Sequence, residues 1–231
     1  MTQRGSGTSR PGLPLSTRIA QAERLQWSVA VVVVLLILGQ AWISSKLGLE
    51  PGWILPAAVA LCAVGSWVAA VFAAVDTRRG WDRYFGLGLV GVLALGTVLG
   101  TMVFATRVFL GTTLSPPELE LTGAVLWPLS VGVFGMAYWE ADMGGPTERP
   151  RRLWDADEAD FMFPQQQPDV VQDWTPSFGD YLYVSLTNAT AFSPTDTMPM
   201  SHMAKFVMGM QSVTSATILL VLVARAVNIA K

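Results

Sequence analysis

Long apolar runs alternate with short polar stretches along most of the chain. Five of these runs reach the roughly 20 residues that a helix needs to cross the hydrocarbon core of a bilayer. They lie at about 25–44, 53–75, 84–110, 119–139 and 202–229. Trp27 and Trp42 stand at the ends of the first run, as interfacial anchors do. The pattern therefore predicts an all-α integral membrane protein with five transmembrane helices.

A further apolar segment, from Pro176 to about Ala189, is too short to cross a bilayer. It is followed by an irregular loop at 190–199 and then by the last span. A short helix, a loop and a full span form the layout of a re-entrant pore loop. Since irregular backbone survives at membrane depth only beside protein or a water-filled cavity, we expect this loop to carry the function.

The polar stretches divide the chain into four regions. Residues 1–24 form a basic tail that we expect to be disordered, and residues 25–139 form a four-helix transmembrane region. Residues 140–175 form an acidic hydrophilic linker, and residues 176–231 hold the short helix, the loop and the last span. The linker is either an acidic vestibule that concentrates cations or a solvated loop whose aromatic side chains lie on the membrane surface.

Positive charge indicates which side of the membrane each end occupies. The tail carries four arginines, and the stretch between the second and third spans adds Arg78, Arg79 and Arg83. Because cytoplasmic loops are enriched in Lys and Arg, the N-terminus is expected in the cytoplasm. With five spans, the acidic linker and the irregular loop then face the cytoplasm as well.

Composition excludes several classes of function. Charged residues make up 14% of the chain, against about 25% in soluble domains. A net charge of −2 gives no reason to expect a nucleic-acid partner. One cysteine, Cys62, and one histidine, His202, do not supply the ligand sets of the common metal sites, and no span pairs a nucleophile with a base. We therefore expect neither an enzyme nor a bound cofactor, and the expected partner is membrane lipid.

The segment from Asp180 to Ser201 resembles the pore helix and filter of tetrameric P-loop potassium channels. That family has the pattern T-A-T-T-V-G-Y-G-D, two residues, and Pro. The corresponding stretch here is Asn188-Ala189-Thr190-Ala191-Phe192-Ser193-Pro194-Thr195-Asp196, two residues, and Pro199. The resemblance covers about a quarter of the chain. It implies a homotetrameric cation channel whose filter-like loop forms the ion pathway at Thr190, Ala191, Phe192, Ser193, Pro194, Thr195 and Asp196.

The departures from the potassium-channel pattern change the expected ion chemistry. Ser193 and Thr195 replace the two filter glycines, and Pro194 replaces the aromatic residue between them. Proline fixes φ and lacks an N–H, so a ladder of backbone carbonyls of the potassium type is not expected. Hydroxyl groups and the carboxylate of Asp196 suit a hydrated, weakly selective path for monovalent cations. The charge count points the loop inward, whereas the filter of potassium channels opens outward, so either the pore is inverted, or the charge rule fails here, or the likeness is only local.

The whole chain also resembles uncharacterised bacterial inner-membrane proteins. These share a basic N-terminus, four spans, an acidic linker with an aromatic-proline element, and a D-Y-L-Y-type helix. The element here is Asp160-Phe161-Met162-Phe163-Pro164. This resemblance implies a bacterial plasma membrane location but no particular activity.

Asp196 and a stripe of residues on the last span each have both a functional and a structural interpretation. Asp196 is either an ion ligand or a cap of the following turn. A stripe on the last span either lines the pore or makes hydrogen bonds between helices. Its members are Gln211, Thr214, Ser215 and Ile218. The leading hypothesis is a P-loop-like cation channel, and the alternative is a non-conducting scaffold or accessory subunit that retains a pore-loop fold.

Overall fold

The computed structural model describes residues 15–48, 81–110, 115–146, 149, 159–166, 174–190 and 196–229. These residues are mostly helical. The long helices are α1 (Leu15–Lys46), α3 (Trp81–Phe109), α4 (Pro116–Ala141) and α6 (His202–Ile229), and the shorter α5 is Phe178–Ala189. Two 3-10 turns, Asp142–Gly144 and Pro164–Gln166, and two strands, β1 (Phe161–Met162) and β2 (Met198–Pro199), complete the described elements. The chain forms two compact units, Met1–Val34 and Leu35–Lys231, and every contact between helices given below lies within the second.

Three helices in the described part of the chain are long and apolar enough to cross a membrane. They contain the spans Gly86–Phe109, Pro117–Gly144 and His202–Arg225, which coincide with the predicted spans at 84–110, 119–139 and 202–229. The predicted span at 53–75 lies outside the described residues. The predicted first span at 25–44 lies within α1, and Val31–Lys46 is an apolar segment of that helix. The chain is thus an all-α protein with at least three candidate membrane spans.

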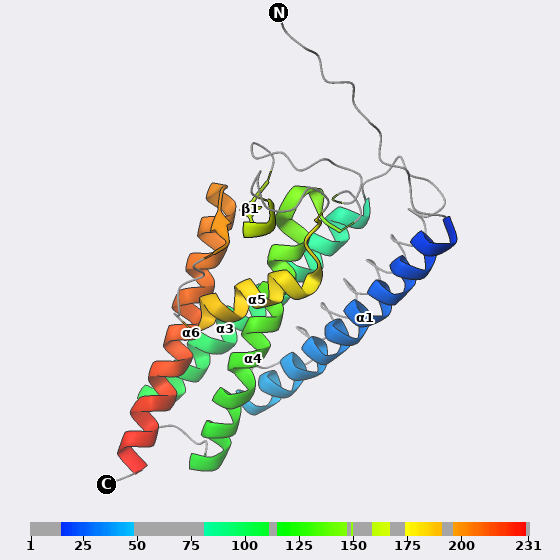
Figure 1. The fold of residues 1–231 in the computed structure, drawn as a ribbon. Helices are drawn as coiled ribbons and strands as arrows, with labels where there is room; N and C mark the ends of the chain where they lie inside the picture. Colours follow the sequence, from blue (N-terminus) through cyan, green and yellow to red (C-terminus); the bar gives the residue numbers. More distant parts are fainter. Residues whose placement is uncertain are drawn as a thin grey trace, which may run out of the picture. The chain divides into compact units, whose positions relative to one another are not determined.

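Helix α4 is the centre of the bundle. Of the candidate span in α4, 72% is buried, whereas the buried share is 44% for the span in α3 and 33% for the span in α6. It packs against α3, α5 and α6 (Figure 1). Gly123 allows close packing at one end, because a Cβ there would lie 2.5 Å from Leu222 and 3.0 Å from Phe104. Near that end an ion pair of 3.3 Å joins Lys46 of α1 to Glu118 of α4.

Helix α5 lies across α4 and α6 instead of running alongside them (Figure 1). The sequence predicts this helix at 176–189, and the structure places it at Phe178–Ala189. Gly135 of α4 accounts for the close contact, since a Cβ at that position would lie 3.2 Å from the backbone Cα of Leu182. Twelve residues give a length of about 18 Å at 1.5 Å per residue, well below the roughly 30 Å of a hydrocarbon core.

The chain reverses direction sharply after α4. Met143, Gly144 and Gly145 have φ values of +48°, +84° and +88°. Residues other than glycine rarely adopt such φ angles. The Gly-Gly pair therefore permits the turn, while Met143 carries backbone strain. Asp142, which precedes these three residues, is fully buried in the protein.

Large apolar side chains cover the outer faces of the bundle. Those on α3 and α6 that are more than half exposed are Tyr84, Leu95, Met102, Phe109, Met203, Phe206, Val213, Leu220, Val223 and Val227. A soluble monomer rarely exposes apolar surface on this scale, whereas lipid or a neighbouring subunit covers it favourably. The exposed faces therefore agree with a location in the membrane.

Candidate functional site

The candidate site is the segment between α5 and α6, together with α5 itself and the parts of α4 and the linker that hold this helix. The start of α5 is fixed first. The backbone N–H and the hydroxyl of Ser177 both donate to the carboxylate of Asp180, each at 2.7 Å. This is a capping arrangement, in which an acid near the first turn also complements the positive end of the helix dipole. The start of α5 is thereby fixed by its own cap.

A buried carboxylate at the end of α4 holds α5 and the linker together. Oδ1 of Asp142 accepts the backbone N–H groups of Asp160 and Phe161 at 2.9 and 3.3 Å. Oδ2 accepts the hydroxyl of Tyr181, on α5. Burial raises the pKa of the Tyr181 hydroxyl, so the group remains protonated and donates to Asp142. One side chain thus joins three segments that are distant in sequence.

Arg149 balances the charge of this carboxylate. Its Nε lies 3.9 Å from Oδ2 of Asp142, and Nη2 donates to the backbone carbonyls of Trp139 and Asp142. The guanidinium carbon also lies 4.7 Å from the centre of the Tyr181 ring, a cation–π distance. Arg149 is only 4% exposed. A buried charge pair of this kind makes the removal of one partner costly.

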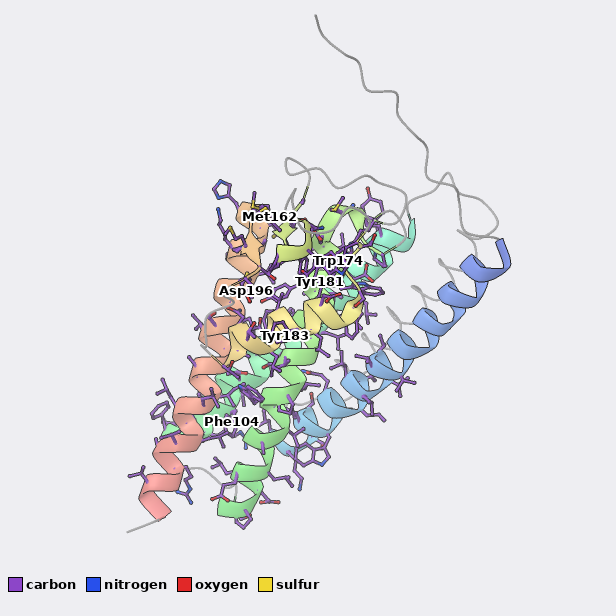
Figure 2. The ribbon with its side chains drawn as sticks, in the orientation of Figure 1. Phe104, Met162, Trp174, Tyr181, Tyr183 and Asp196 are labelled. Atoms are coloured by element: carbon purple, nitrogen blue, oxygen red, sulfur yellow. The ribbon has the colours of Figure 1, made fainter. Side chains whose placement is uncertain are left out.

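Aromatic rings from the linker fill the space above α5. Phe161 packs against Tyr138 and Tyr181, with ring centroids 5.1 and 6.1 Å apart. Phe163 packs against Tyr181 and Trp174, at 5.2 and 5.3 Å. Figure 2 labels Trp174 and Tyr181, the two rings that Phe163 contacts. This part of the acidic linker is therefore packed against the helices, and the aromatic-proline element supplies the packing residues.

A second polar cluster fixes the other end of α5 to α4 and α6. The amide Nδ2 of Asn188 donates to the carbonyl of Met208 and to Oε1 of Gln211, each at 3.0 Å, and to the hydroxyl of Tyr138 at 3.2 Å. Tyr138 in turn donates to Oε1 of Gln211. Nε2 of Gln211 donates to the carbonyl and the hydroxyl of Ser185, at 2.9 and 2.7 Å.

The side chains of this cluster form a connected network inside the bundle. Ser185 donates from its hydroxyl to the carbonyl of Val131 at 2.7 Å, and Ser212 donates to Oδ1 of Asn188 at 3.1 Å. Tyr138, Ser185 and Gln211 are at most 1% exposed. A network that satisfies its buried polar groups fixes the relative positions of the helices that contribute to it. The end of α5 is held in this way.

The filter-like loop itself is described only at its two ends. Thr190 ends α5, and its hydroxyl contacts the carbonyls of Leu186 and Thr187, each at 3.1 Å. The predicted pathway residues Ala191, Phe192, Ser193, Pro194 and Thr195 lie outside the described residues. Asp196 is exposed, and Figure 2 places it beside α6.

The chain that follows the loop is tied to the linker. Strands β1 and β2 pair antiparallel, with Phe161 opposite Pro199 and Met162 opposite Met198. Met200 donates its N–H to the carbonyl of Asp160 at 2.8 Å. The hydroxyl of Ser201 donates to the carboxylate of Asp160 and accepts the N–H of Ala204 at 3.0 Å, which caps α6.

The residues proposed from the sequence to line a pore lie in the interior of the described chain. Gln211, Thr214, Ser215 and Ile218 are between 0% and 5% exposed. Gln211 makes the hydrogen bonds between helices described above, and the hydroxyl of Thr214 bonds the carbonyl of Met210 within its own helix at 2.8 Å. Of the two interpretations that the sequence leaves open for this stripe, hydrogen bonding between helices accounts for the contacts of Gln211.

Sequence reasoning missed the pair Asp142 and Arg149 as a structural centre. It treated both as members of a charged linker. The available signal was position: Asp142 directly follows an apolar span, and two glycines come after it. A charged residue at the end of a span, followed by a tight turn, is placed to point back into the protein.

The described residues contain no group of three or more His, Cys, Asp or Glu side chains that would hold a metal ion. No family model, curated protein or solved structure matches the chain. The functional argument therefore rests on the residues and contacts of the chain itself.

Proposed function

We propose that the chain is one subunit of a homotetrameric, P-loop-like cation channel in a bacterial plasma membrane, with five spans and α5 as a re-entrant pore helix. The observation that carries the proposal is the way α5 is held. A helix too short to cross a bilayer packs across α4 and α6 and is anchored at both ends by buried polar groups. Such anchoring suits a segment that presents a loop at a fixed depth.

The expected ion chemistry follows from the side chains of the loop. Thr190, Ser193 and Thr195 supply hydroxyl groups, and Asp196 supplies a carboxylate. Hydroxyls and one acid per subunit would stabilise a hydrated monovalent cation without the close fit that strong selectivity needs. The exposure of Asp196 leaves its carboxylate accessible to ions.

A pore on a symmetry axis requires several copies of the chain, because one re-entrant segment does not enclose an axial path. The exposed apolar surfaces give the copies faces on which to meet. Tyr183 and Leu186 lie on the outer side of α5 and are 63% and 41% exposed. Phe206 and Val213 lie on the outer side of α6 and are 63% and 69% exposed. Contacts between these faces in neighbouring subunits would close the ring.

A non-conducting scaffold or accessory subunit is the second candidate, and one observation favours it. The polar stripe of α6 is buried within its own subunit, so the outer face of this helix is apolar where a pore lining would be polar. Together with the loss of both filter glycines, this arrangement fits a pore-loop fold that stabilises a complex without conducting.

Ion flux distinguishes the two candidates. The purified protein is reconstituted into liposomes, and K⁺ and Na⁺ fluxes are compared for the wild type, Asp196→Asn and Glu120→Gln. Glu120 is an exposed acid near the start of α4, at the other end of that helix from the Asp142 cluster, and it controls for the loss of one charge. A channel gives wild-type flux that changes in selectivity or collapses in Asp196→Asn alone. Absence of flux from a monomeric wild-type protein overturns the channel and leaves the scaffold.

A further inference from the structure

Methionine side chains gather where the acidic linker meets the start of α6. Met198, Met200 and Met203 are 51%, 39% and 62% exposed, and Met162 is half-buried. Figure 2 shows Met162 beside the N-terminal end of α6, with sulfur atoms around it. This group is separate from the buried hydrogen-bond clusters that hold α5.

The pairing of β1 with β2 places three of these thioethers on one face. Met162 lies directly opposite Met198, and residues in that relation have Cβ atoms about 4.5–5.5 Å apart on the same side of the ribbon. Met200 is two residues beyond Met198, and its N–H extends the pairing to the carbonyl of Asp160. Since side chains alternate along a strand, Met200 shares the face of Met198.

The opposite face of the ribbon is the inner one. Phe161 is 1% exposed and packs against Tyr138 and Tyr181. The alternation of Phe161 with Met162 therefore directs one residue into the aromatic packing and the other outward. The methionine face is set by the fold and does not depend on the conformation of a free loop.

The only histidine of the chain follows immediately. His202, the first residue of α6, is exposed and is two residues beyond Met200. The nearest carboxylate of the ribbon, that of Asp160, already accepts the hydroxyl of Ser201. That carboxylate lies opposite Met200 and is engaged through Oδ1, and the other polar or sulfur side chains at this point are the thioethers and the imidazole.

We propose that this ribbon binds a soft monovalent metal ion, Cu(I) or its analogue Ag(I), through the sulfur atoms of Met162, Met198 and Met200, with His202 as the nitrogen ligand. Thioether sulfur selects Cu(I) over hard cations, which require oxygen ligands. The thioether ligands have no proton to lose, and the metal enters as Cu(I), so binding involves no redox step. The proposal requires neither a pore nor a tetramer, and it stands independently of the proposed function.

Metal titration tests the proposal on the full-length protein in detergent. Ag(I) is followed by calorimetry, and Cu(I) kept reduced with ascorbate is followed by competition with a coloured chelator. The wild type is compared with the triple variant M162L/M198L/M200L and with M102L. Leucine approximates the volume of methionine without its sulfur. Met102 is 60% exposed on α3 and serves as the matched control.

We expect one metal ion per chain for the wild type and for M102L, and loss of binding in the triple variant. Absence of binding by the wild type, or equal binding by the triple variant, overturns the proposal. The exposed methionines would then be an adaptable surface for lipid or a protein partner, a common use of this residue.

A second measurement needs no variant and covers the case in which the triple variant does not fold. Peroxide oxidises exposed methionines to sulfoxides, which mass spectrometry assigns to each position. Bound Ag(I) is expected to protect Met162, Met198 and Met200 while Met102 oxidises at its usual rate. Equal oxidation of all four positions with and without Ag(I) contradicts the site.

Discussion

The hydroxyl of Tyr181 donates a hydrogen bond to the carboxylate of Asp142, although the two residues lie 39 positions apart in the chain. The same carboxylate accepts the N–H of Asp160, whose own carboxylate accepts the hydroxyl of Ser201 at the start of α6. These bonds lead from α5 to Asp142 at the end of α4, from Asp142 to the linker at Asp160, and from Asp160 to Ser201 at the start of α6. The start of α6, which follows the filter-like loop, is therefore tied to α5 by contacts remote from the loop itself.

Replacing Tyr181 by phenylalanine tests the first of these bonds. The ring and its packing remain, but Asp142 loses a donor to its charged group. Hydrogen bonds to charged groups contribute about 1.5–3 kcal/mol, so we expect the free energy of unfolding to fall by about that amount. Thermal unfolding in detergent measures the change. Tyr183→Phe, on the exposed side of the same helix, is the control and should have almost no effect.

Replacing Asp142 by asparagine should cost more than the loss of the tyrosine hydroxyl. It leaves the charge of Arg149 buried without its partner, which typically destabilises a protein by about 3–5 kcal/mol. Chemical or thermal unfolding of Asp142→Asn measures this. If the charge pair is responsible, the double variant D142N/R149Q will lose less than the sum of the two single variants. Additive losses would show that the two side chains act independently.

The turn after α4 depends on glycine at position 145. Its φ of +88° and ψ of −178° fall in a region that is nearly exclusive to glycine, and a Cβ there would lie 3.2 Å from the carbonyl oxygen of Glu140. We expect Gly145→Ala to destabilise the protein by about 1–3 kcal/mol. Gly88→Ala is the control: Gly88 is helical with no atom within 4 Å of an added Cβ, so alanine should be neutral or stabilising.

Gln211 is expected to matter for stability through its buried network. Substitution by leucine leaves buried polar groups of Asn188, Tyr138 and Ser185 with fewer partners. Each unsatisfied group costs about 1–3 kcal/mol, so Gln211→Leu should lower the unfolding temperature markedly. Ser212→Ala removes a single bond at the edge of the network and should have a smaller effect. A stable Gln211→Leu protein with altered ion flux would instead favour a pore-lining role.

The helices were accessible from the sequence because hydropathy and length determine them. The sequence predicts the last span at 202–229, and α6 occupies His202–Ile229. The short helix differs only at its start, where the Ser177–Asp180 cap places the first residue at Phe178. The sequence also identified the aromatic-proline element, although not the surface on which it packs.

The contacts that hold the loop were not accessible in the same way. Two of these contacts are the pairing of Phe161 with Pro199 and the hydrogen bond from Tyr181 to Asp142. Each joins segments that are far apart in the chain, and hydrophobic periodicity predicts single elements but not which distant elements meet. Polar residues such as Asn188 and Gln211 occupy the same positions in the sequence pattern whether they line a pore or bond to each other, as they do here. Only the three-dimensional packing of α4, α5 and α6 distinguishes these cases.

The register of the short ribbon is open to direct test by cross-linking. In a Cys62→Ala background, M162C/M198C places cysteines at directly opposite positions, where Cα atoms lie about 4.5–5.5 Å apart and fit a disulfide. We expect mild oxidation to join them rapidly, as mass spectrometry of the digest would show. The diagonal pair M162C/M200C, about 7–8 Å apart, should react far more slowly. Faster reaction of the diagonal pair would mean a shifted register, and no reaction of either would remove the ribbon on which the proposed metal site depends.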